Sequence, residues 1–390
     1  MIIEPKIFGN ICLNAHPRGC GVQVQEQIDY VRARGRIEGA GNALIIGASN
    51  GYGLATRILA AYGCGAGTLG ISFERPGSVS KSGSAGYYND AAFLQAARRD
   101  GLAAESINGD AFSREIKQQA IARIRESLGS VDLVVYSIAS PRRLDPQTGT
   151  LHSSVIKPLG RPFEAKTVNF LTGEVSQVRA EPAETEKEID DTVKVMGGED
   201  WLLWIDALEA AGLLAERCTT IAFSYIGPRF TAPIYRDGTI GRAKEHLERT
   251  AKDLNRRLAV RGGRALISVN KALVTRASAV IPAVPLYIAL LYRVMKEKGL
   301  HEACIQQIDR LFRDHLYGDQ PPPTDEEGRI RLDDREMLPE VQEEVAKRWR
   351  VVDSENVGSL SDIAGFRAEY LKYHGFGIEG IDYAEDVNPA

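Results

Sequence analysis

The stretch Ala43-Leu44-Ile45-Ile46-Gly47-Ala48-Ser49-Asn50-Gly51-Tyr52-Gly53 decides the fold. Its first four residues form an apolar run that predicts a fully buried parallel strand. After the third glycine, apolar side chains recur with a helical period at Leu54, Ile58, Leu59 and Tyr62. The glycines therefore lie where a strand turns sharply into a helix, which lets the backbone approach a pyrophosphate and offers the free N–H groups of a helix N-terminus. We expect a nucleotide to bind here; a purely structural turn is the alternative.

Further apolar runs predict strands along the chain. They are Thr68–Phe73, Ala104–Ile107, Val131–Tyr136, Thr219–Tyr225 and Ala265–Val269. A short strand from Met1 to Ile7 and a helix around Val22 to Arg34 are expected ahead of the glycine turn. Strands alternate with helical patterns, and the glycine spacing is similar to that of short-chain dehydrogenases. Both features predict an α/β fold with a Rossmann-type doubly wound parallel sheet.

The middle and the end of the chain elaborate this pattern. From Pro141 to about Glu184 the periodicity fails and turn pairs separate short alternating segments, which predicts β-hairpins inserted above the sheet. Helices are expected from about Ile189 to Leu214 and, beyond Ala283, at Leu286–Glu297, His301–Leu316 and Leu338–Trp349. We expect residues 1–390 to form a single dinucleotide-binding domain, with the insertion at about 141–184 and a helical elaboration at about 283–390.

The second strand ends at Glu74, close to the ~20-residue spacing from the glycines that is expected of a ribose-binding acid. A carboxylate there accepts hydrogen bonds from both ribose hydroxyls and repels a 2′-phosphate, which favours NADH over NADPH. The adjacent Arg75 could hold that phosphate. Pro76 after it indicates that the guanidinium turns away.

The third and fourth strands end in residues that suit a dinucleotide. Asp110 follows the third strand, where it could accept a hydrogen bond from an adenine amino group or belong to the N-cap region of a helix from Ser113 to Leu128. The fourth strand ends in Ser137–Pro141, whose small residues would let a dinucleotide pass over the sheet.

We expect the catalytic residues in the stretch Tyr235–Lys244, where a phenol precedes an ammonium by nine residues. Apolar residues spaced three and four apart from Ile240 predict a buried helix face, with Lys244 beside it. Nine helical residues would set the two side chains on opposite sides, so Tyr235 should precede the helix. Gly238 permits a turn and Thr239 is a plausible N-cap, which would let the loop fold Tyr235 back over the first helical turn.

A tyrosine beside a lysine suits a reductase. The nearby cation favours phenolate and makes the phenol a better acid towards an oxyanion formed by hydride addition. A surface tyrosine and a solvated lysine are the alternative. Because open parallel sheets bind ligands at the carboxyl ends of their strands, the position of the pair after the fifth strand favours the chemical interpretation.

The composition excludes several classes of protein. A formal net charge of −4 over 390 residues, without a Lys/Arg run, offers no surface for nucleic acid. There is no signal peptide and no apolar span of the ~20 residues that a membrane helix needs, so we expect a cytoplasmic protein without stable membrane insertion. The five cysteines are scattered, and no disulfide is expected. Cys12, His16 and Cys20 are spaced four apart, but a closed zinc site needs a fourth ligand, so no metal is expected.

Several long motifs resemble those of the trans-2-enoyl-CoA reductase and FabV-type enoyl-acyl-carrier-protein reductase family, most closely its CoA-linked members. Besides the glycine turn, the Ser137–Pro141 segment and the stretch from Tyr235 to Lys244, the motifs are Ile11–Pro17, Met196–Trp201 and Val274–Pro282. The similarity covers nearly the whole chain. Ile138 stands where leucine is common, which is a conservative departure.

The resemblance implies that NADH reduces the 2,3-trans double bond of an enoyl thioester, carried by CoA or an acyl carrier protein, in fatty acid synthesis. Tyr235 would be the proton donor, Lys244 an NADH contact and Tyr225 a substrate-binding residue. Further cofactor contacts are implied at Gly47, Ala48, Ser49, Asn50, Gly51, Tyr52, Phe73, Glu74, Asp110, Ala111, Ile138, Ala139, Leu273, Val274 and Thr275. Tyr235, with Tyr225, would stabilise the charge that builds on the thioester oxygen. A monomer is expected, with a dimer as the alternative.

An apolar segment, Ala279–Ile288, follows the implied cofactor loop. Its prolines should keep a helix from starting before about Pro285 and leave a formed but movable wall beside the nicotinamide. Such a wall suits an acyl tail, and we expect Ile281 to line it. Ordinary core is the alternative.

Two other functions stay open. A short-chain ketoreductase would use the same apparatus on a carbonyl, but a spacing of Tyr-x3-Lys is expected there, because four residues span one helical turn. A non-catalytic nucleotide sensor would bind NADH without turnover.

Overall fold

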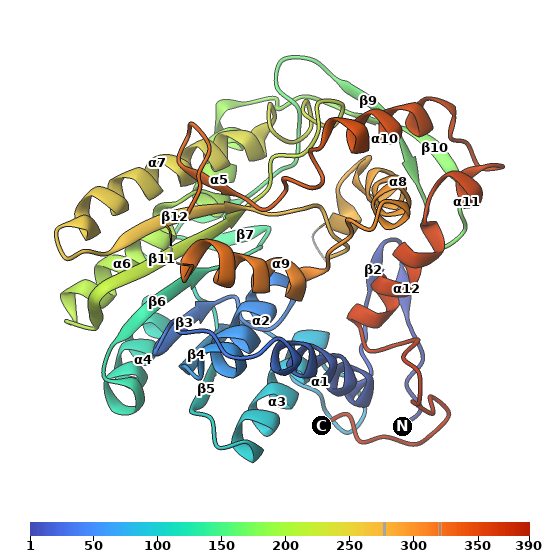
Figure 1. The fold of residues 1–390 in the computed structure, drawn as a ribbon. Coiled ribbons are helices and arrows are strands. Elements are labelled where there is room, and N and C mark those ends of the chain that lie inside the picture. Colours follow the sequence, from blue (N-terminus) through green and yellow to red (C-terminus); the bar gives the residue numbers. More distant parts are fainter. Residues whose placement is uncertain (276–277, 319, 321) are drawn as a thin grey trace.

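The computed structural model describes residues 1–275, 278–318, 320 and 322–390. Within them, seven parallel strands form a sheet in the order β13-β12-β11-β6-β3-β4-β5 (Figure 1). The strands are β3 (Asn42–Ile46), β4 (Gly67–Ser72), β5 (Ala104–Asn108), β6 (Val131–Tyr136), β11 (Leu214–Ser224), β12 (Arg264–Val269) and β13 (Arg329–Arg331). The strand order reverses between β3 and β6, so the predicted doubly wound sheet is confirmed.

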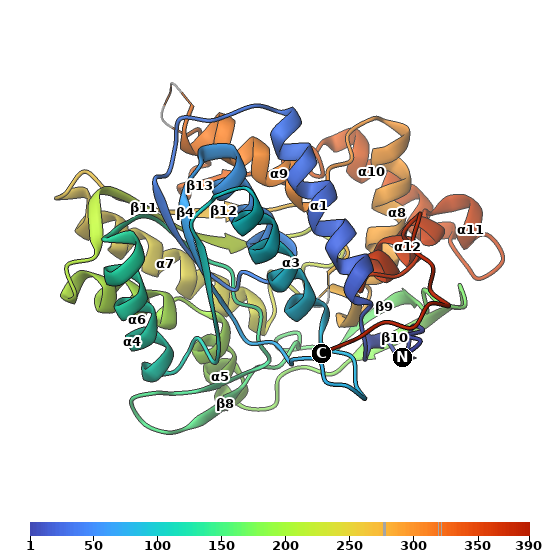
Figure 2. The same ribbon diagram turned by 90° about the horizontal axis from the view of Figure 1, so that it is seen from below.

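Strand β3 shows how the sheet acquires a core on both faces. Ala43 and Ile45 contribute to the apolar cluster on one face, whereas Leu44 and Ile46 contribute to that on the other, and all four are fully buried. The first face is covered by α1 (Pro17–Ala33), α2 (Gly51–Ile58), α3 (Ala85–Arg99) and α9 (Cys304–Arg310) (Figures 1 and 2). The second is covered by α4 (Arg114–Arg123), α6 (Glu199–Ala210) and α7 (Thr239–Ala259). Helices α2, α4 and α9 continue as π-helical segments η1 (Leu59–Cys64), η2 (Ile124–Leu128) and η4 (Leu311–Leu316).

Between β6 and β11 the chain leaves the sheet. Two antiparallel hairpins form there, β7 (Arg142–Leu144) with β8 (Leu151–Ser153) and β9 (Phe163–Val168) with β10 (Val175–Ala180). They confirm the hairpins predicted for about 141–184. Helix α5 (Glu186–Met196) follows and packs against α7 before α6 returns the chain to the sheet.

The region after residue 283 is largely helical, as predicted. Helix α8 (Val284–Glu297) is enclosed on nearly all sides, and α10 (Pro339–Val351) and α12 (Ile363–Tyr373) pack against it. Helix α8 begins at Val284, close to the predicted start at about Pro285, and Ala283 immediately before it has a φ of 66°. A short 3₁₀ turn, η3 (Ser278–Val280), and helix α11 (Val357–Leu360) complete this region. The edge strand β13 was not predicted, because Ile330 is the only apolar residue in it.

The amino-terminal segment differs from the prediction. Instead of one strand from Met1 to Ile7, a hairpin joins β1 (Ile7–Phe8) to β2 (Ile11–Cys12). Helix α1 begins at Pro17 rather than near Val22. His16 caps it, since its Nδ1 accepts a hydrogen bond from the N–H of Gly19 at 3.3 Å, and a proline in the first turn costs no helical hydrogen bond. Apolar periodicity alone could not reveal a histidine cap.

Candidate active site

The glycine turn between β3 and α2 is closed by contact of backbone on backbone. A Cβ at Gly47 would lie 2.2 Å from the carbonyl oxygen of Ser137, and a Cβ at Gly53 would lie 1.8 Å from that of Gly47. No side chain fits at these distances, so both positions require glycine. At Gly51 a Cβ would meet nothing within 4 Å, which leaves bare backbone open to a ligand.

Helix α2 begins at Gly51 with unused hydrogen-bond donors. Its N-cap residue, Asn50, makes no side-chain bond to the helix, and no acidic residue stands in the first turn. The amide of Asn50 instead donates to Glu74 at 3.2 Å. The N–H groups of the first turn and the positive end of the helix dipole are therefore free for an anion, which fits the pyrophosphate of a dinucleotide.

Glu74 lies beyond the end of β4 and is fixed beside this turn. The hydroxyl of Ser49 donates to its Oε1 at 2.7 Å, and that of Ser84 donates to its Oε2 at 2.6 Å. Because Oε1 also accepts from the Asn50 amide, both of its lone pairs are used, whereas Oε2 retains one lone pair for a ribose hydroxyl. Phe73, the preceding residue, is 78% exposed, so its ring is accessible to a ligand at the same edge of the sheet.

Arg75 is engaged elsewhere. Its guanidinium donates to the carbonyl oxygens of Leu13 at 2.9 Å and Ser82 at 3.3 Å. Nη2 of Arg75 is thus already engaged by backbone carbonyls, which weakens its use for a 2′-phosphate.

The ends of β5 and β6 continue this edge of the sheet. One carboxylate oxygen of Asp110 accepts a hydrogen bond from the N–H of Phe112 at 3.0 Å, while Ser113 is the N-cap of α4. Asp110 therefore shapes the turn before the helix. The carbonyl of Ala111 is occupied by the side chains of Lys117 and Trp204. After β6, Ile138 is half-buried and Ala139 is exposed.

The segment after β12 is fixed from two sides. The hydroxyl of Tyr52, on α2, donates to the carbonyl of Lys271 at 2.9 Å and so links this segment to the glycine turn. The N–H of Val274 donates to the hydroxyl of Tyr292, on α8, at 3.0 Å. The backbone of this implied cofactor loop is therefore held in place by both α2 and α8.

The far end of the same loop is closed by Ser278. Its hydroxyl donates to the carbonyl of Leu273 at 2.7 Å and accepts from the N–H of Thr275 at 2.8 Å. Leu273 and Val274 are buried and Thr275 is half-buried. Arg276 and Ala277, which belong to the same sequence motif, lie outside the described residues.

Tyr235 precedes α7, as predicted, and its turn folds back on the helix. The contact lies at Gly241, where a Cβ would be 1.7 Å from the carbonyl oxygen of Arg236 and 3.1 Å from that of Tyr235. Lys244 stands three residues after Gly241 and thus on the same face, and helical side chains point towards the helix N-terminus. Lys244 therefore lies on the same face of α7 as this contact.

The start of α7 corrects one prediction. The N-cap is Gly238, and Thr239 is the first helical residue. The hydroxyl of Thr239 donates to the carbonyl of Val155 at 2.5 Å, and its N–H donates to that of Lys157 at 3.0 Å. Thr239 is not the cap because its hydroxyl fastens the helix to the inserted segment.

Burial is the main cause of the pKa shifts of Tyr235 and Lys244. It raises the pKa of Tyr235 to about 12, with no effect from Lys244, so the expectation that the lysine favours phenolate is wrong for this structure. Burial also lowers the pKa of Lys244 to about 8, against an opposing effect of Glu248. Among the described residues, neither the phenol nor the amine has a hydrogen-bond partner. Both are half-buried and available to a ligand.

Tyr225, beyond the end of β11, packs against Tyr235. Their ring centres lie 5.0 Å apart with an interplanar angle of 79°. The hydroxyl of Tyr225 donates to Oε1 of Glu336 at 3.1 Å. Glu336 is fully buried and was not among the predicted site residues, because in the sequence it follows Asp333, Asp334 and Arg335 like any charged loop residue.

Ile281 shares an apolar cluster with this pair. It is 7% exposed and belongs to the apolar cluster against which Tyr225 and Tyr235 pack. A second small cluster, made of Phe163, Ile234 and Ala283, also packs against Tyr235. The surroundings of the two tyrosines are therefore apolar on several sides.

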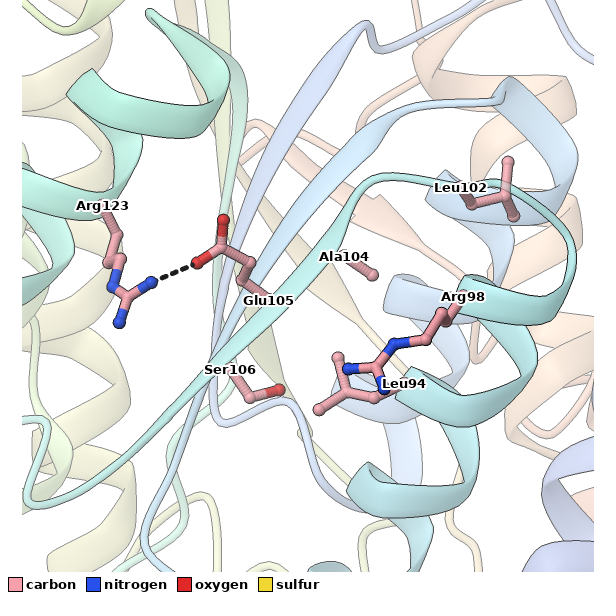
Figure 3. Close-up of a pocket in the computed structure, with 7 residues that line it drawn as sticks. All are labelled: Leu94, Arg98, Leu102, Ala104, Glu105, Ser106 and Arg123. Atoms are coloured by element: carbon pink, nitrogen blue, oxygen red, sulfur yellow. Dashed lines mark hydrogen bonds and ion pairs between the residues drawn. The ribbon is translucent and has the colours of Figure 1, made fainter.

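A hollow of about 400 Å³ beside β5 does not belong to this site. It is lined by Leu94, Arg98, Leu102, Ala104, Glu105, Ser106 and Arg123 (Figure 3). Arg123 donates to the carboxylate of Glu105 at 2.9 Å within it. Since β5 is an edge strand and none of the predicted site residues lines the hollow, we assign it no part in the chemistry.

Three family models match the chain in succession. The NAD(P)H binding domain of trans-2-enoyl-CoA reductase matches residues 2–79, and the trans-2-enoyl-CoA reductase catalytic region matches residues 81–317, which is most of the chain. The chain belongs to the trans-2-enoyl-CoA reductase family. The family inferred from the motifs is thus confirmed. An enoyl reductase FAD binding domain matches residues 324–387.

Members of the family resemble the chain along its whole length. The enoyl-acyl-carrier-protein reductase (NADH) of Coxiella burnetii is 56% identical over 390 residues, covering 99% of this chain and 96% of its own. The structure of Treponema denticola trans-2-enoyl-CoA reductase in complex with NAD has a TM-score of 0.96 at 52% identity, covering 100% of this chain and 98% of that one. The Clostridium acetobutulicum trans-2-enoyl-CoA reductase in complex with NADH has a TM-score of 0.97 at 44% identity, with the same coverage.

Residues 324–387 do not fit a flavin dinucleotide. Of the two long helices in this segment, α10 begins with Pro339 and Glu340. Helix α12 is capped by Asp362, whose carboxylate accepts from the N–H of Gly365 at 3.1 Å. A pyrophosphate needs free N–H groups and no competing anion at a helix N-terminus. The segment instead packs against α8 and contributes Glu336 to the site.

The Cys12, His16 and Cys20 spacing has a structural explanation. The ring of His16 caps α1, and Cys12 Sγ donates to the carbonyl of Asn14 at 3.2 Å. Among the described residues, no group of three or more side chains is placed to hold a metal ion. All five cysteines are free thiols.

No helix within the described ranges is long and apolar enough to cross a membrane.

Proposed function

We propose that the protein reduces the 2,3-trans double bond of enoyl thioesters with NADH, in fatty acid synthesis, and that Tyr235, Tyr225 and Lys244 carry the reaction. One observation supports this most directly. The turn that bears Tyr235 rests on Gly241 in the first turn of α7, and neither the phenol nor the Lys244 amine has a hydrogen-bond partner in the part of the chain that the structure describes. Both residues follow β11, at the carboxyl edge of the sheet, where open parallel sheets bind ligands.

The cofactor would lie along this edge. The glycine turn, Gly47 to Tyr52, and the start of α2 would hold its pyrophosphate, and Glu74 would accept hydrogen bonds from the adenosine ribose. The adenine end would meet Phe73, Asp110 and Ala111. The nicotinamide end would meet Ile138, Ala139, Lys244 and the loop Leu273, Val274 and Thr275. When bound, NADH supplies the hydride that adds to the β-carbon of the substrate.

The phenol of Tyr235 would act on the thioester oxygen. Its raised pKa keeps it protonated, so it donates a hydrogen bond to that oxygen as negative charge builds. This bond is stronger in the transition state than with the neutral thioester, and therefore accelerates the reaction rather than merely binding substrate. A proton then reaches the α-carbon, directly or after tautomerisation. Tyr225, whose ring packs against that of Tyr235, would contact the substrate.

One assay separates this function from the two alternatives. The rate of NADH consumption is measured with crotonyl-CoA, with acetoacetyl-CoA and without an acyl substrate. We expect consumption with crotonyl-CoA alone. Consumption with acetoacetyl-CoA instead would identify a ketoreductase, and binding of NADH without turnover on either thioester would identify a sensor.

The carrier of the acyl chain is a separate part of the proposal. The related proteins described above include both a CoA-linked and an acyl-carrier-protein-linked reductase. We propose that this protein accepts enoyl-CoA and also enoyl-acyl-carrier protein. The ratio of kcat/KM for one acyl group on the two carriers tests this, since a ratio far from one would assign the enzyme to a single carrier.

We propose further that residues 1–390 act as one dinucleotide-binding domain, as a monomer in the cytoplasm. The single domain is supported by one apolar cluster, which joins Ile3, Val168 of β9, Leu273 and Val274 of the proposed cofactor loop, and Phe366 of α12. One cooperative unfolding transition and one sedimenting species of monomer mass are expected. A separate early transition of the helical region would contradict the single domain.

A further inference from the structure

Glu336 is a buried carboxylate with three donors from three different elements. Its Oε1 accepts the hydroxyl of Tyr225 at 3.1 Å and that of Tyr287, on α8, at 2.5 Å. Its Oε2 accepts the N–H of Ala272 at 2.7 Å. The side chain has no exposed surface. A carboxylate in such a place is costly unless it is fully hydrogen-bonded, so these three donors are what allows it there.

The charge of Glu336 is only partly compensated by its surroundings. Burial raises its pKa and the nearby Asp333 adds to this, while Lys271 and the donors on Tyr287 and Ala272 act in the opposite direction. Lys271 makes no direct ion pair with it, since its amine donates to the carbonyl of Ala272 at 2.9 Å. The hydroxyls and the backbone N–H therefore fix the position of the carboxylate. In turn, the carboxylate fixes the positions of Tyr225, Tyr287 and the backbone at Ala272.

We propose that Glu336 is a positioning residue for the reduction: one carboxylate fixes Tyr225 against Tyr235 and, at the same time, the start of the loop that is to hold the nicotinamide. This inference rests on the proposed function of the site. Tyr225 packs on the proposed proton donor, and Ala272 immediately precedes Leu273 to Thr275. A single carboxylate thus sets the distance between the proposed proton donor and the loop that is to hold the nicotinamide. Misplacement of reacting groups by about 1 Å can lower a rate by about 10²-fold.

Replacement by glutamine tests the carboxylate without changing its size. An amide has one accepting and one donating end, so it cannot accept both from the two hydroxyls and from the N–H of Ala272. We expect Glu336→Gln to lower kcat with crotonyl-CoA by about 10-fold or more.

A double-mutant cycle with Tyr225→Phe separates positioning from a general structural effect. Phenylalanine keeps the ring but has no hydroxyl for Glu336 to hold. If Glu336 acts on chemistry through Tyr225, Glu336→Gln should lower kcat by less than about 2-fold in the Tyr225→Phe background. Its remaining effect, through Ala272, should appear in the KM for NADH rather than in kcat.

Asp333→Asn is the matched control. Asp333 is also a buried carboxylate of this segment, 1% exposed, but it pairs with Arg331 at 2.7 Å. Its replacement should leave kcat within about 2-fold of the unmodified protein. A loss as large as that of Glu336→Gln would mean that any buried charge here matters, and would overturn the inference.

The remaining outcomes are also decisive. Equal losses from Glu336→Gln in both backgrounds, or no loss in either, would overturn the positioning role. If the glutamine variant does not fold, Glu336→Asp enters the same cycle, because it keeps the charge but is shorter by one methylene, and the same outcomes apply. If Tyr225→Phe alone leaves kcat unchanged, the assignment of Tyr225 in the proposed function fails instead.

Discussion

Tyr225 and Tyr235 meet edge to face, with 5.0 Å between their ring centres, although one follows a strand of the sheet and the other lies in the turn before a helix. Such a contact restrains an aromatic ring without using its hydroxyl. Tyr235 is therefore held in place while its hydroxyl makes no hydrogen bond to any of the described residues.

Replacement of Tyr235 by phenylalanine should lower kcat by about 10²-fold or more, because the hydrogen bond that strengthens in the transition state is lost. The affinity for NADH, measured by fluorescence titration, should change little. Turnover close to that of the unmodified protein would exclude Tyr235 as the donor, and Tyr225 would become the leading candidate.

The KM for NADH should rise as the pH is raised from about 7 to about 9. The pKa of Lys244 is lowered to about 8, so the amine loses its charge in this range and attracts the anionic cofactor less. Lys244→Arg is the control, since a guanidinium stays protonated throughout. The arginine variant should show a flat profile. A rise that persists in it would point to another group, such as Lys271, whose pKa is also about 8.

Glu74→Ala should narrow the preference for NADH over NADPH. The substitution removes both an acceptor for the ribose and a charge that repels a 2′-phosphate. The ratio of kcat/KM for the two cofactors is the measurement. Because Arg75 is bound to the carbonyls of Leu13 and Ser82, we expect the ratio to approach one rather than reverse. An unchanged ratio would leave Glu74 with only its structural bonds to Ser49, Asn50 and Ser84.

Ile281→Trp should penalise long acyl chains more than short ones. Each buried methylene contributes about 0.8 kcal/mol, so a lined pocket improves kcat/KM severalfold per added carbon pair until its end is reached. The loss should be larger with hexenoyl-CoA than with crotonyl-CoA. Equal losses across a series of chain lengths would show that Ile281 is ordinary core and that the acyl chain lies elsewhere.

Local patterns in the sequence were sufficient to predict most of the fold. The apolar run before Gly47 and the periodicity after Gly53 identify a strand and a helix from neighbouring residues alone. The elements that were missed depend on distant contacts. Strand β13 has one apolar residue and exists because β12 offers it an edge, and the start of α1 depends on a histidine cap.

In the site too, features that depend on neighbouring residues could be predicted and features that depend on distant contacts could not. Helical geometry was enough to place Tyr235 in a turn before α7, and the contact at Gly241 agrees with it. Glu336 could not be found, because its importance arises only when the chain brings residue 225 and residue 336 together. The effect of Lys244 on the phenol was mispredicted for a related reason: sequence spacing shows which charges are near but not how deeply a hydroxyl is buried.

The insertion between β6 and β11 also affects how this chain acquires its structure. Strands β3 to β6 are synthesised in succession, but β11, which must pair with β6, emerges only after the whole stretch from Ser137 to Leu213. Until then β6 is an open edge with an apolar face at Leu133 and Val135, which invites pairing with other chains. Helix α6 is made just before β11, and its Trp201 and Trp204 pack on the opposite face of the same strands. The inserted segment therefore delays closure of the sheet, and side chains that cover one face of β6 are synthesised only shortly before β11 itself.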